Sequence, residues 1–301
     1  MRPAAAVCAP KACSLLRNGG PPTTKDKGGD RMTIRIECDG KVATVIHSRP
    51  EARNAMDPES AEALTEAFLE LDAKSSVSAI VFWGEGGAFC AGWDLKYAQA
   101  FTDPVRFKAE IVEGLAFPAD GATPPRGPMG PSRLEMSKPL IAAIEGPAVA
   151  GGMELALWCD VRVMAEDAYF GVYCRRWGIP LIDGGTVRLP RLVGQGRALE
   201  IIMTGRKVEA QEALRIGLCE QTVPHGQARA AAEAMAQQIA RFPQGAMLAD
   251  RRSAIAGHGL PVREALAREW GGGVETIATE GAAGAERFAS GKGRGGDFAD
   301  I

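Results

Sequence analysis

The chain has 301 residues, a formal net charge of −2, 46 % hydrophobic residues and 24 % charged residues. These values are typical of a globular protein that is long enough to bury a large core. The near-neutral charge and short basic clusters do not favour binding to nucleic acid, and no run of 18 uncharged apolar residues is present to span a membrane. We therefore expect neither nucleic acid nor a membrane as a partner.

Cysteine and histidine are the residue types that would reveal a disulfide framework or a metal centre. The seven cysteines form no CxxC pair and lie partly within apolar runs, which favours buried free thiols and a reducing cytoplasm. The three histidines stand apart from one another and from other ligand types. The sequence therefore predicts no metal site.

The first 31 residues differ in composition from the rest of the chain. Proline, glycine, alanine and lysine dominate there, and the first acidic residue is Asp26. We expect residues 1–31 to be a disordered extension. Early basic residues leave a transit peptide open, while a mis-assigned start codon or a dispensable tail is the simpler interpretation.

Regular patterns begin at Thr33. Alternating apolar residues over 34–38, a turn at Asp39-Gly40 and an apolar run over 42–46 predict a hairpin. A first-turn proline after Asp57 and an apolar stripe at helical spacing predict an amphipathic helix that reaches Leu71.

The middle of the chain repeats strand, turn and helix. Buried strands are expected over 79–83, 140–144 and 161–164, a further one over 169–172, and a short helix over 152–158. The stretch 117–131 is so rich in proline and glycine that we expect a mobile surface excursion. The repeat suggests a stacked ββα arrangement in which helices connect parallel strands.

Beyond Gly184 the pattern is mainly helical, with a weak strand signal over 218–223. Helices are predicted over 186–192, 195–203, 209–215 and 227–241. We divide the chain into the extension 1–31, a core over 32–225, and a helical region with a basic tail over 226–301. The apolar faces of the helices exceed what one subunit covers, which suggests oligomerisation.

The stretch PAVAGGMELALWCD, residues 147–160, places a carboxylate inside an apolar helix. A buried charge at Glu154 costs several kcal/mol unless a partner or a function offsets it, by an order-of-magnitude estimate. Glycines before this helix and around Gly92 leave unpaired N–H groups at two helix starts. If both starts point at one place, they form an oxyanion hole with Glu154 beside it; two ordinary turns are the alternative.

Several motifs together resemble the crotonase superfamily, also called the enoyl-CoA hydratase/isomerase family. The likeness runs from about residue 32 into the C-terminal region, in the order and spacing of that family. The motifs that carry it are RPEARNAM at 49–56, AFCAGWDLK at 88–96, GPAVAGGMELA at 146–156 and CD at 159–160.

The resemblance implies an α/β fold with a ββα-spiral core and a helical C-terminal trimerisation region. It implies an acyl-CoA thioester substrate, with coenzyme A as part of the substrate rather than a cofactor, and a homotrimer or a dimer of trimers. The thioester carbonyl would lie between the main-chain N–H groups of Trp93 and Gly151, with Glu154 as the acid–base residue.

The coenzyme A moiety would, by the same resemblance, run along the backbone of two motifs. The residues that would border it are Ala55, Ala91, Asp94 and Leu95. Arg53 and Lys96 are candidate contacts for it, although plain solvent exposure explains their basic side chains equally well.

The chain departs from the hydratase pattern at Cys174, where the family has a second glutamate twenty residues after the first. A thiol is a poor substitute for a carboxylic acid near neutral pH. Cys174 is therefore a pocket-lining apolar residue, an acid–base or nucleophilic group assisted by Arg175 or Arg176, or a replacement whose duty passes to Asp183. Asp183, before Gly-Gly-Thr, is equally well explained as a helix cap.

The leading hypothesis for function is hydration of a 2-enoyl-CoA to a 3-hydroxyacyl-CoA. Double-bond isomerisation needs only one proton shuttle and is the runner-up, followed by thioester hydrolysis. A non-catalytic acyl-CoA binder is the alternative from another class, because the second carboxylate is missing. An RNA-associated or structural oligomer has only the short basic clusters in its favour. The length of the acyl chain is not readable from the sequence.

Overall fold

Six strands form the main sheet, in the order β1-β2-β3-β4-β6-β9. The computed structural model describes residues 33–119, 121–123, 125–293 and 295, so the predicted extension 1–31 lies outside them. β1 and β2 form the predicted hairpin, and every other neighbouring pair is parallel. The strands are β1 (Ile34–Asp39), β2 (Val42–His47), β3 (Ala79–Gly84), β4 (Leu140–Ile144), β6 (Val161–Ala165) and β9 (Gln221–Val223).

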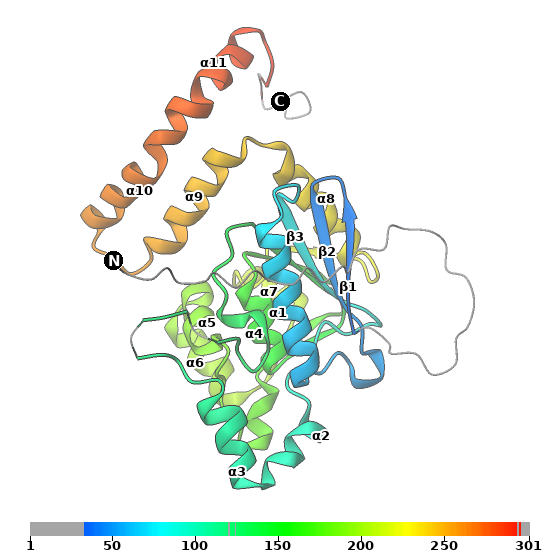
Figure 1. The fold of residues 1–301 in the computed structure, drawn as a ribbon. Helices are drawn as coiled ribbons and strands as arrows, with labels where there is room; N and C mark the ends of the chain where they lie inside the picture. Colours follow the sequence, from blue (N-terminus) through cyan, green and yellow to red (C-terminus); the bar gives the residue numbers. More distant parts are fainter. Residues whose placement is uncertain (1–32, 120, 124, 294, 296–301) are drawn as a thin grey trace, which may run out of the picture. The chain divides into compact units, whose positions relative to one another are not determined.

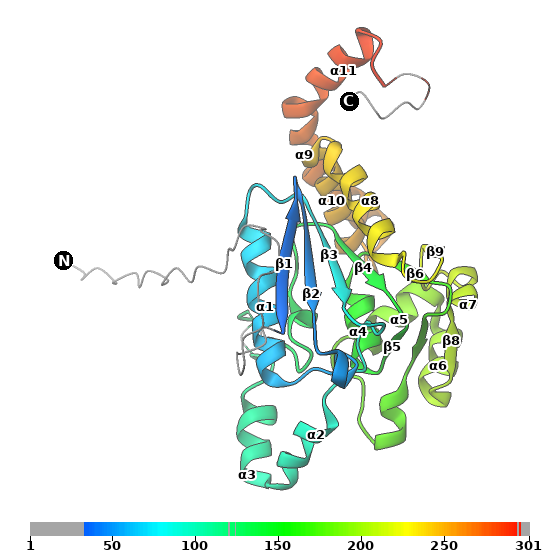
Figure 2. The ribbon, with the colours of Figure 1, turned by 90° about the vertical axis from the view of Figure 1, so that its right-hand side faces the viewer.

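The central strands are apolar and buried along their length because helices cover both faces of the sheet (Figures 1 and 2). On one face lies α1 (Pro58–Ala73), which is capped by the Asp57 carboxylate accepting from the Ser60 N–H at 2.8 Å. On the other face lies α8 (Ala228–Arg241), whose buried alanines pack on β2, β3, β4 and β6. The α8 helix, on the C-terminal side of the predicted boundary at residue 226, is thus part of the core packing.

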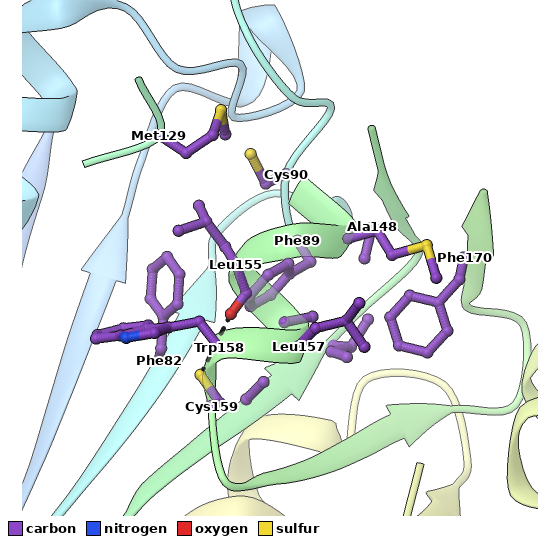
Figure 3. Close-up of a cluster of buried hydrophobic side chains, with 14 of the residues drawn as sticks. Phe82, Phe89, Cys90, Met129, Ala148, Leu155, Leu157, Trp158, Cys159 and Phe170 are labelled. Atoms are coloured by element: carbon purple, nitrogen blue, oxygen red, sulfur yellow. Dashed lines mark hydrogen bonds between the residues drawn. The ribbon is translucent and has the colours of Figure 1, made fainter. Parts of the chain in front are cut away.

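The short helix α4 (Gly151–Trp158) lies inside the molecule, and all eight of its residues are buried. Figure 3 shows the aromatic and aliphatic side chains around it. Phe82 meets Phe89 edge-on with ring centroids 4.9 Å apart, and Trp158 contacts Phe68 at 4.8 Å. A helix that is apolar on all sides requires such surroundings, so the carboxylate of Glu154 is held within the core region.

A second, three-stranded sheet stands next to α4. It consists of β5 (Pro147–Val149), β7 (Tyr169–Gly171) and β8 (Lys207–Glu209), with β5 and β7 parallel and β8 antiparallel to β7. β5 leads directly into α4, so this sheet sets the direction in which the helix begins. Its third strand was not predicted, because the sequence pattern assigned residue 209 to a helix.

Residues 95–115, here called the outer wall, form a series of short helical turns. Aromatic contacts hold them together: Phe101 stacks on Trp93 with centroids 5.4 Å apart and meets Tyr97 and Phe107 edge-on. Tyr97 and Arg106 both donate to Glu110, at 2.8 and 2.6 Å. The turns are α2 (Leu95–Ala98), η2 (Gln99–Thr102), α3 (Pro104–Phe107) and η3 (Lys108–Glu113).

The remaining helices follow β7 along the chain, and the predicted helices beyond Gly184 are confirmed within one or two residues. α10 packs along α9, as Figure 1 shows, and Glu280 accepts the N–H groups of Gly245 and Ala246 at the start of α9. The helices are α5 (Gly185–Val193), α6 (Gln195–Thr204), α7 (Ala210–Arg215), α9 (Gln244–Ala256), α10 (Val262–Thr276) and α11 (Ala282–Ala289), and the short turns are η1 (Pro50–Ala52), η4 (Pro131–Arg133), η5 (Tyr173–Trp177) and η6 (Ile277–Gly281).

The mobile excursion expected over 117–131 is wrong for its C-terminal part. Gly127 and Gly130 close a turn with reciprocal N–H···O bonds of 2.8 and 2.9 Å, and Met129 within it is 1 % exposed. Proline and glycine predicted irregular backbone correctly, but they did not reveal that a distant carboxylate anchors this turn.

Candidate active site

The start of α4 is a strained turn that leaves one amide without a partner. Ala150 has φ 53° and ψ −126°, a conformation that is costly for a residue with a side chain and that often marks a functional site. Among the described residues, the Gly151 N–H has no hydrogen-bond acceptor. A Cβ on Gly152 would lie 2.0 Å from the carbonyl oxygen of Cys90, so only glycine fits here.

The loop after β3 lies directly against this turn. The backbone of Cys90 forms an isolated β-bridge with that of Ala148. A Cβ on Gly92 would lie 3.1 Å from the nitrogen of Gly151. The bonds Met56 N–H to Gly92 O and Asp94 N–H to Met56 O, both 2.8 Å, hold the loop on each side of Trp93.

The Trp93 N–H, between these two bonds, has no acceptor among the residues that the structure describes. The two loops therefore bring two free amides, those of Trp93 and Gly151, into one neighbourhood. Free N–H groups at a helix start are suited to an oxygen that gains negative charge.

Glu154 lies in the first turn of α4, 3 % exposed. Its Oε1 accepts two main-chain N–H groups, from Asp183 at 2.9 Å and from Gly185 at 2.8 Å. Its Oε2 has no hydrogen-bond partner within the described part of the chain. Burial first, and the charge of Asp183 second, raise the pKa of Glu154 to about 7. One carboxylate oxygen is thus fixed and the other is free to exchange a proton near neutral pH.

Asp183 is buried beside Glu154, but its side chain has other partners. Its Oδ1 accepts the Met129 N–H at 3.1 Å and the hydroxyl of Ser132 in a short contact. Burial raises the pKa of Asp183, and these two hydrogen bonds oppose that rise. The helix-cap interpretation is wrong, because Gly184 occupies the cap position of α5 and no side chain caps that helix.

Cys174 lies in η5, buried in the apolar cluster that surrounds α4. Burial, followed by the charge of Glu154, raises the pKa of the Cys174 thiol, and Arg175 opposes this only in part. The thiol is therefore held in its protonated form at neutral pH, and the interpretation in which a neighbouring arginine lowers its pKa is wrong in direction. The surroundings are those of a buried apolar residue.

The residues expected along coenzyme A follow the edge of the same site. Ala91 donates its N–H to the Arg53 carbonyl at 3.0 Å, which joins the two motifs. The side chains of Arg53 and Lys96 are exposed and have no partner among the described residues, whereas Ala55 is half-buried and Leu95 is exposed. The carboxylate of Asp94 caps α2 and pairs with Arg49 at 3.1 Å, which fixes the backbone expected to border coenzyme A.

Arg49 and Asn54 are structural residues that the sequence motif contained but whose roles it did not reveal. Arg49 donates to the Ala55 carbonyl and pairs with Asp57 and Asp94. Asn54, in left-handed conformation at φ 56°, donates to the carbonyls of two residues in the loop after β3 and accepts the Arg49 N–H at 2.7 Å. Met129, Ser132 and Arg188 carry no sequence signal, since Met129 and Ser132 bind Asp183 and Arg188 binds Ser132 across more than fifty residues.

A cavity of about 470 Å³ opens beside Trp93, a volume within the range of small-molecule sites. It lies between α1, the outer wall and the loop before Gly127. Arg126, at its edge, pairs with Glu62 at 2.6 Å. Its lining residues are Pro58, Glu62, Thr65, Trp93, Phe101, Glu110, Ile111, Gly114, Leu115, Pro125, Arg126 and Pro128.

Within the described residues, no cluster of three or more histidine, cysteine, aspartate or glutamate side chains is placed to hold a metal ion. No helix in the described part of the chain combines the length and apolar character needed to cross a membrane.

Known proteins are similar to this chain in sequence and in fold over most of its length. The family model described as enoyl-CoA hydratase/isomerase matches residues 37–115 and 132–268. Enoyl-CoA hydratase EchA19 of Mycobacterium tuberculosis is 34 % identical over 81 % of this chain and 86 % of its own. (E)-benzylidenesuccinyl-CoA hydratase of Thauera aromatica is 32 % identical over 78 % of this chain and 87 % of its own. The crystal structure of an enoyl-CoA hydratase from Mycobacterium tuberculosis H37Rv has a TM-score of 0.76 and 31 % identity, covering 86 % of this chain and 96 % of that one.

The chain therefore belongs to the enoyl-CoA hydratase/isomerase family. It is an enzyme of that family, its fold is the mixed α/β fold of crotonase-like structures, and the resemblance found in its motifs is confirmed.

Proposed function

We propose that the chain hydrates a 2-enoyl-CoA thioester to the 3-hydroxyacyl-CoA. The observation that carries this proposal is the state of Glu154: two amides fix one of its oxygens, the other is free, and it lies one turn after the unpaired Gly151 N–H. That combination places an acid–base group beside a site for an oxyanion.

The thioester carbonyl oxygen is assigned to the two free amides. Attack on C3 of the enoyl group moves electron density through C2 to this oxygen, which becomes enolate-like. Donors already aimed at the oxygen need no reorganisation as the charge develops. In comparable sites each such donor lowers the activation free energy by about 2.7–4 kcal/mol. The Trp93 and Gly151 N–H groups would therefore stabilise the enolate more than the substrate.

Glu154 is assigned both proton transfers. Its ionised Oε2 takes a proton from water as the water oxygen bonds to C3 and the C2–C3 π electrons shift toward the thioester. The protonated carboxyl then returns that proton to C2, the enolate collapses, and the sum is addition of one water. A pKa near 7 suits both steps, because neither form of Glu154 is strongly disfavoured at neutral pH.

The two parts of the substrate are assigned to two places beside Trp93, the cavity for the acyl group and the backbone of Ala55 and Ala91 for coenzyme A. The acyl group would enter the cavity between α1 and the outer wall, whose lining is mostly apolar. Coenzyme A would follow the backbone of Ala55 and Ala91, where the unpartnered side chains of Arg53 and Lys96 can meet its phosphates.

A homotrimer, or a dimer of trimers, remains our proposal for the assembly. α10 exposes Val262, Leu266 and Trp270 along one side, and these are 76 %, 57 % and 66 % exposed in the single chain. Apolar surface of this extent favours association with other copies. The described cysteines are free thiols, which fits the cytoplasm that we propose as the compartment.

Double-bond isomerisation is the second candidate, and a specific observation favours it. Glu154 is a carboxylate with one free oxygen, and Cys174 stands where the hydratase pattern has a second glutamate. One carboxylate suffices to take a proton from C2 of a 3-enoyl-CoA and to return it at C4, which moves the double bond from C3–C4 to C2–C3. A non-catalytic acyl-CoA binder is the third.

Product analysis with crotonyl-CoA and 3-hexenoyl-CoA separates these candidates. Formation of 3-hydroxybutyryl-CoA from crotonyl-CoA supports the hydratase. Conversion of 3-hexenoyl-CoA to 2-hexenoyl-CoA without any hydration supports the isomerase. Absence of turnover with either substrate, while butanoyl-CoA still binds, supports the binder and overturns the proposed function.

A further inference from the structure

We infer that Asp183 is a positioning residue: with Ser132 and Arg188 it forms a buried bracket that holds Glu154 and the Met129 turn against the start of α4. In this role Asp183 exchanges no proton with the substrate. The inference rests on the proposed function, because it assigns the second acidic residue of the same site.

The bracket joins two segments that are about fifty residues apart in the chain. The carboxylate of Asp183 accepts from Met129 and Ser132, and the guanidinium of Arg188 donates to the carbonyls of Asp183 at 2.9 Å and Ser132 at 2.8 Å. Three of these hydrogen bonds cross between the two segments, and the fourth, from Arg188 to the Asp183 carbonyl, holds the guanidinium in place. Together they fix the turn far more firmly than its own short sequence does.

Asp183 also fixes Glu154, through its main chain. Its N–H donates to Glu154 Oε1, the same oxygen that Gly185 binds. Any displacement of residue 183 therefore moves both the reacting carboxylate and the turn that packs beside it. Small shifts of this kind are costly to a rate because the reacting atoms must stay aligned.

The turn reaches the oxyanion site through Met129. A Cβ on Gly151 would lie 2.5 Å from the Met129 sulfur, so the Met129 side chain rests directly on the residue whose N–H is free. Figure 3 shows Met129 among the buried side chains around α4. The main chain of Met129 binds Asp183 while its side chain contacts Gly151.

The contacts of Asp183 favour a positioning role. Its Oδ1 is occupied by an N–H and a hydroxyl, and both donors belong to the protein rather than to a substrate. The turn is also built around this oxygen, since a Cβ on Gly127 would lie 2.4 Å from it and 2.1 Å from Ser132 Oγ. Oδ2 accepts no hydrogen bond among the described residues, and the comparison of Asp183→Asn with Asp183→Ala tests whether it exchanges a proton.

The decisive variants are Asp183→Asn and Asp183→Ala. The amide oxygen of asparagine still accepts from Met129 and Ser132, so Asp183→Asn should keep kcat for crotonyl-CoA within about tenfold of wild type. Asp183→Ala removes both contacts and should lower kcat by about 100-fold. Ser132→Ala leaves the contact between Met129 and Asp183, so its kcat should lie between those of the two Asp183 variants. Asp72→Asn, a half-buried acid outside the site that accepts from Ser137, is the matched control and should leave kcat unchanged.

The pH dependence of kcat/KM is a further measurement, because a general loss of structure would lower kcat/KM without moving its acid limb. In Asp183→Asn the acid limb of kcat/KM should move to lower pH, because the charge that helps to raise the pKa of Glu154 is gone. Asparagine cannot donate the proton of an acid, so equal loss of kcat in Asp183→Asn and Asp183→Ala, with melting temperatures unchanged, would overturn the inference.

Wild-type turnover separates this inference from the proposed function. If wild type converts no enoyl-CoA, the proposed function fails, and the affinity of the same variants for butanoyl-CoA, measured by calorimetry, then tests the bracket. Near-normal affinity in Asp183→Asn with clearly weaker affinity in Asp183→Ala supports it. Equal affinity in all variants overturns it.

Discussion

The two sides of the candidate active site are built in opposite ways. On the Glu154 side, Glu154, Asp183, Ser132 and Arg188 are largely removed from water, and long-range hydrogen bonds hold them together. The outer wall, residues 95–115, is held by aromatic contacts and exposed ion pairs. Exposed pairs contribute little to stability, so this side can rearrange at small cost. The difference suggests that the Glu154 side determines the reaction and the outer wall determines the acyl group.

The largest effect should come from removing the proton shuttle on the buried side. Glu154→Gln keeps an oxygen for the Asp183 and Gly185 amides but cannot accept a proton, so kcat for crotonyl-CoA should fall by about 10²–10⁴-fold with little change in KM. Steady-state hydration kinetics measure this. Retention of more than a tenth of wild-type kcat would show that another group carries the proton.

The pH dependence of the wild type should reveal the same group. Because the reaction begins with ionised Glu154 and its pKa is raised to about 7, kcat/KM should fall about tenfold for each pH unit below that value. A profile that is flat between pH 5.5 and 7.5 would contradict the assignment of Glu154 as the base.

Glu154→Gln should also change stability, in the opposite direction to activity. A carboxyl whose folded pKa is raised from 4.5 to about 7 contributes its full stability below pH 4.5 and loses it as pH rises through 7, at a cost of about 3 kcal/mol. Glutamine does not ionise, so at pH 8 the variant should be more stable than wild type by up to that amount. At pH 5 the gain should shrink to below about 1 kcal/mol. Urea denaturation at both pH values measures it, and an equal gain at both would contradict the raised pKa.

Gly127→Ala tests how tightly the buried side is packed. Its Cβ would meet Ser132 Oγ and Asp183 Oδ1 at 2.1 and 2.4 Å, so we expect a loss of about 1–3 kcal/mol in unfolding free energy together with reduced kcat. Gly196→Ala in α6 is the matched control, because no atom lies within 4 Å of its Cβ, and alanine is the better helix former. Equal unfolding free energies and equal kcat values in Gly127→Ala and Gly196→Ala would contradict the tight packing around Gly127.

The smallest effect on the reaction should come from the outer wall. Phe101→Ala opens the cavity where Phe101 stacks on Trp93, so kcat for crotonyl-CoA should stay within about threefold while the KM for longer enoyl groups changes by a larger factor. A series of 2-enoyl-CoA substrates of increasing length measures both. A uniform loss of kcat across the series would place the outer wall in the chemistry instead.

The sequence predicted the strands of the main sheet better than the short helices and the short strand β8. Alternation over 34–38 indicated β1, and the apolar runs of β2, β3, β4 and β6 indicated the central strands of the main sheet, because burial on both faces imposes a continuous apolar run. The four-residue helices of the outer wall are too short to show a period. β8 was missed because three residues carry no pattern.

For the site, the sequence indicated which residues take part, but not how their side chains are oriented. Glycine and alanine before Glu154 indicated free amides, and the structure brings Trp93 close to Gly151 and Asp183 close to Glu154. The orientation of Asp183 depends on Ser132 and Met129, more than fifty residues earlier, and no local pattern encodes such a contact. For the same reason the Gly127–Gly130 turn was expected to be mobile.

The oxyanion assignment is best tested by a crystal structure of the wild type with butanoyl-CoA, which has no double bond to hydrate. We expect the thioester oxygen within about 3 Å of both the Trp93 and Gly151 nitrogens. We also expect the free oxygen of Glu154 to face C2 and C3. A thioester oxygen bound away from either amide, or a Glu154 carboxylate turned from the acyl chain, would contradict the assignment.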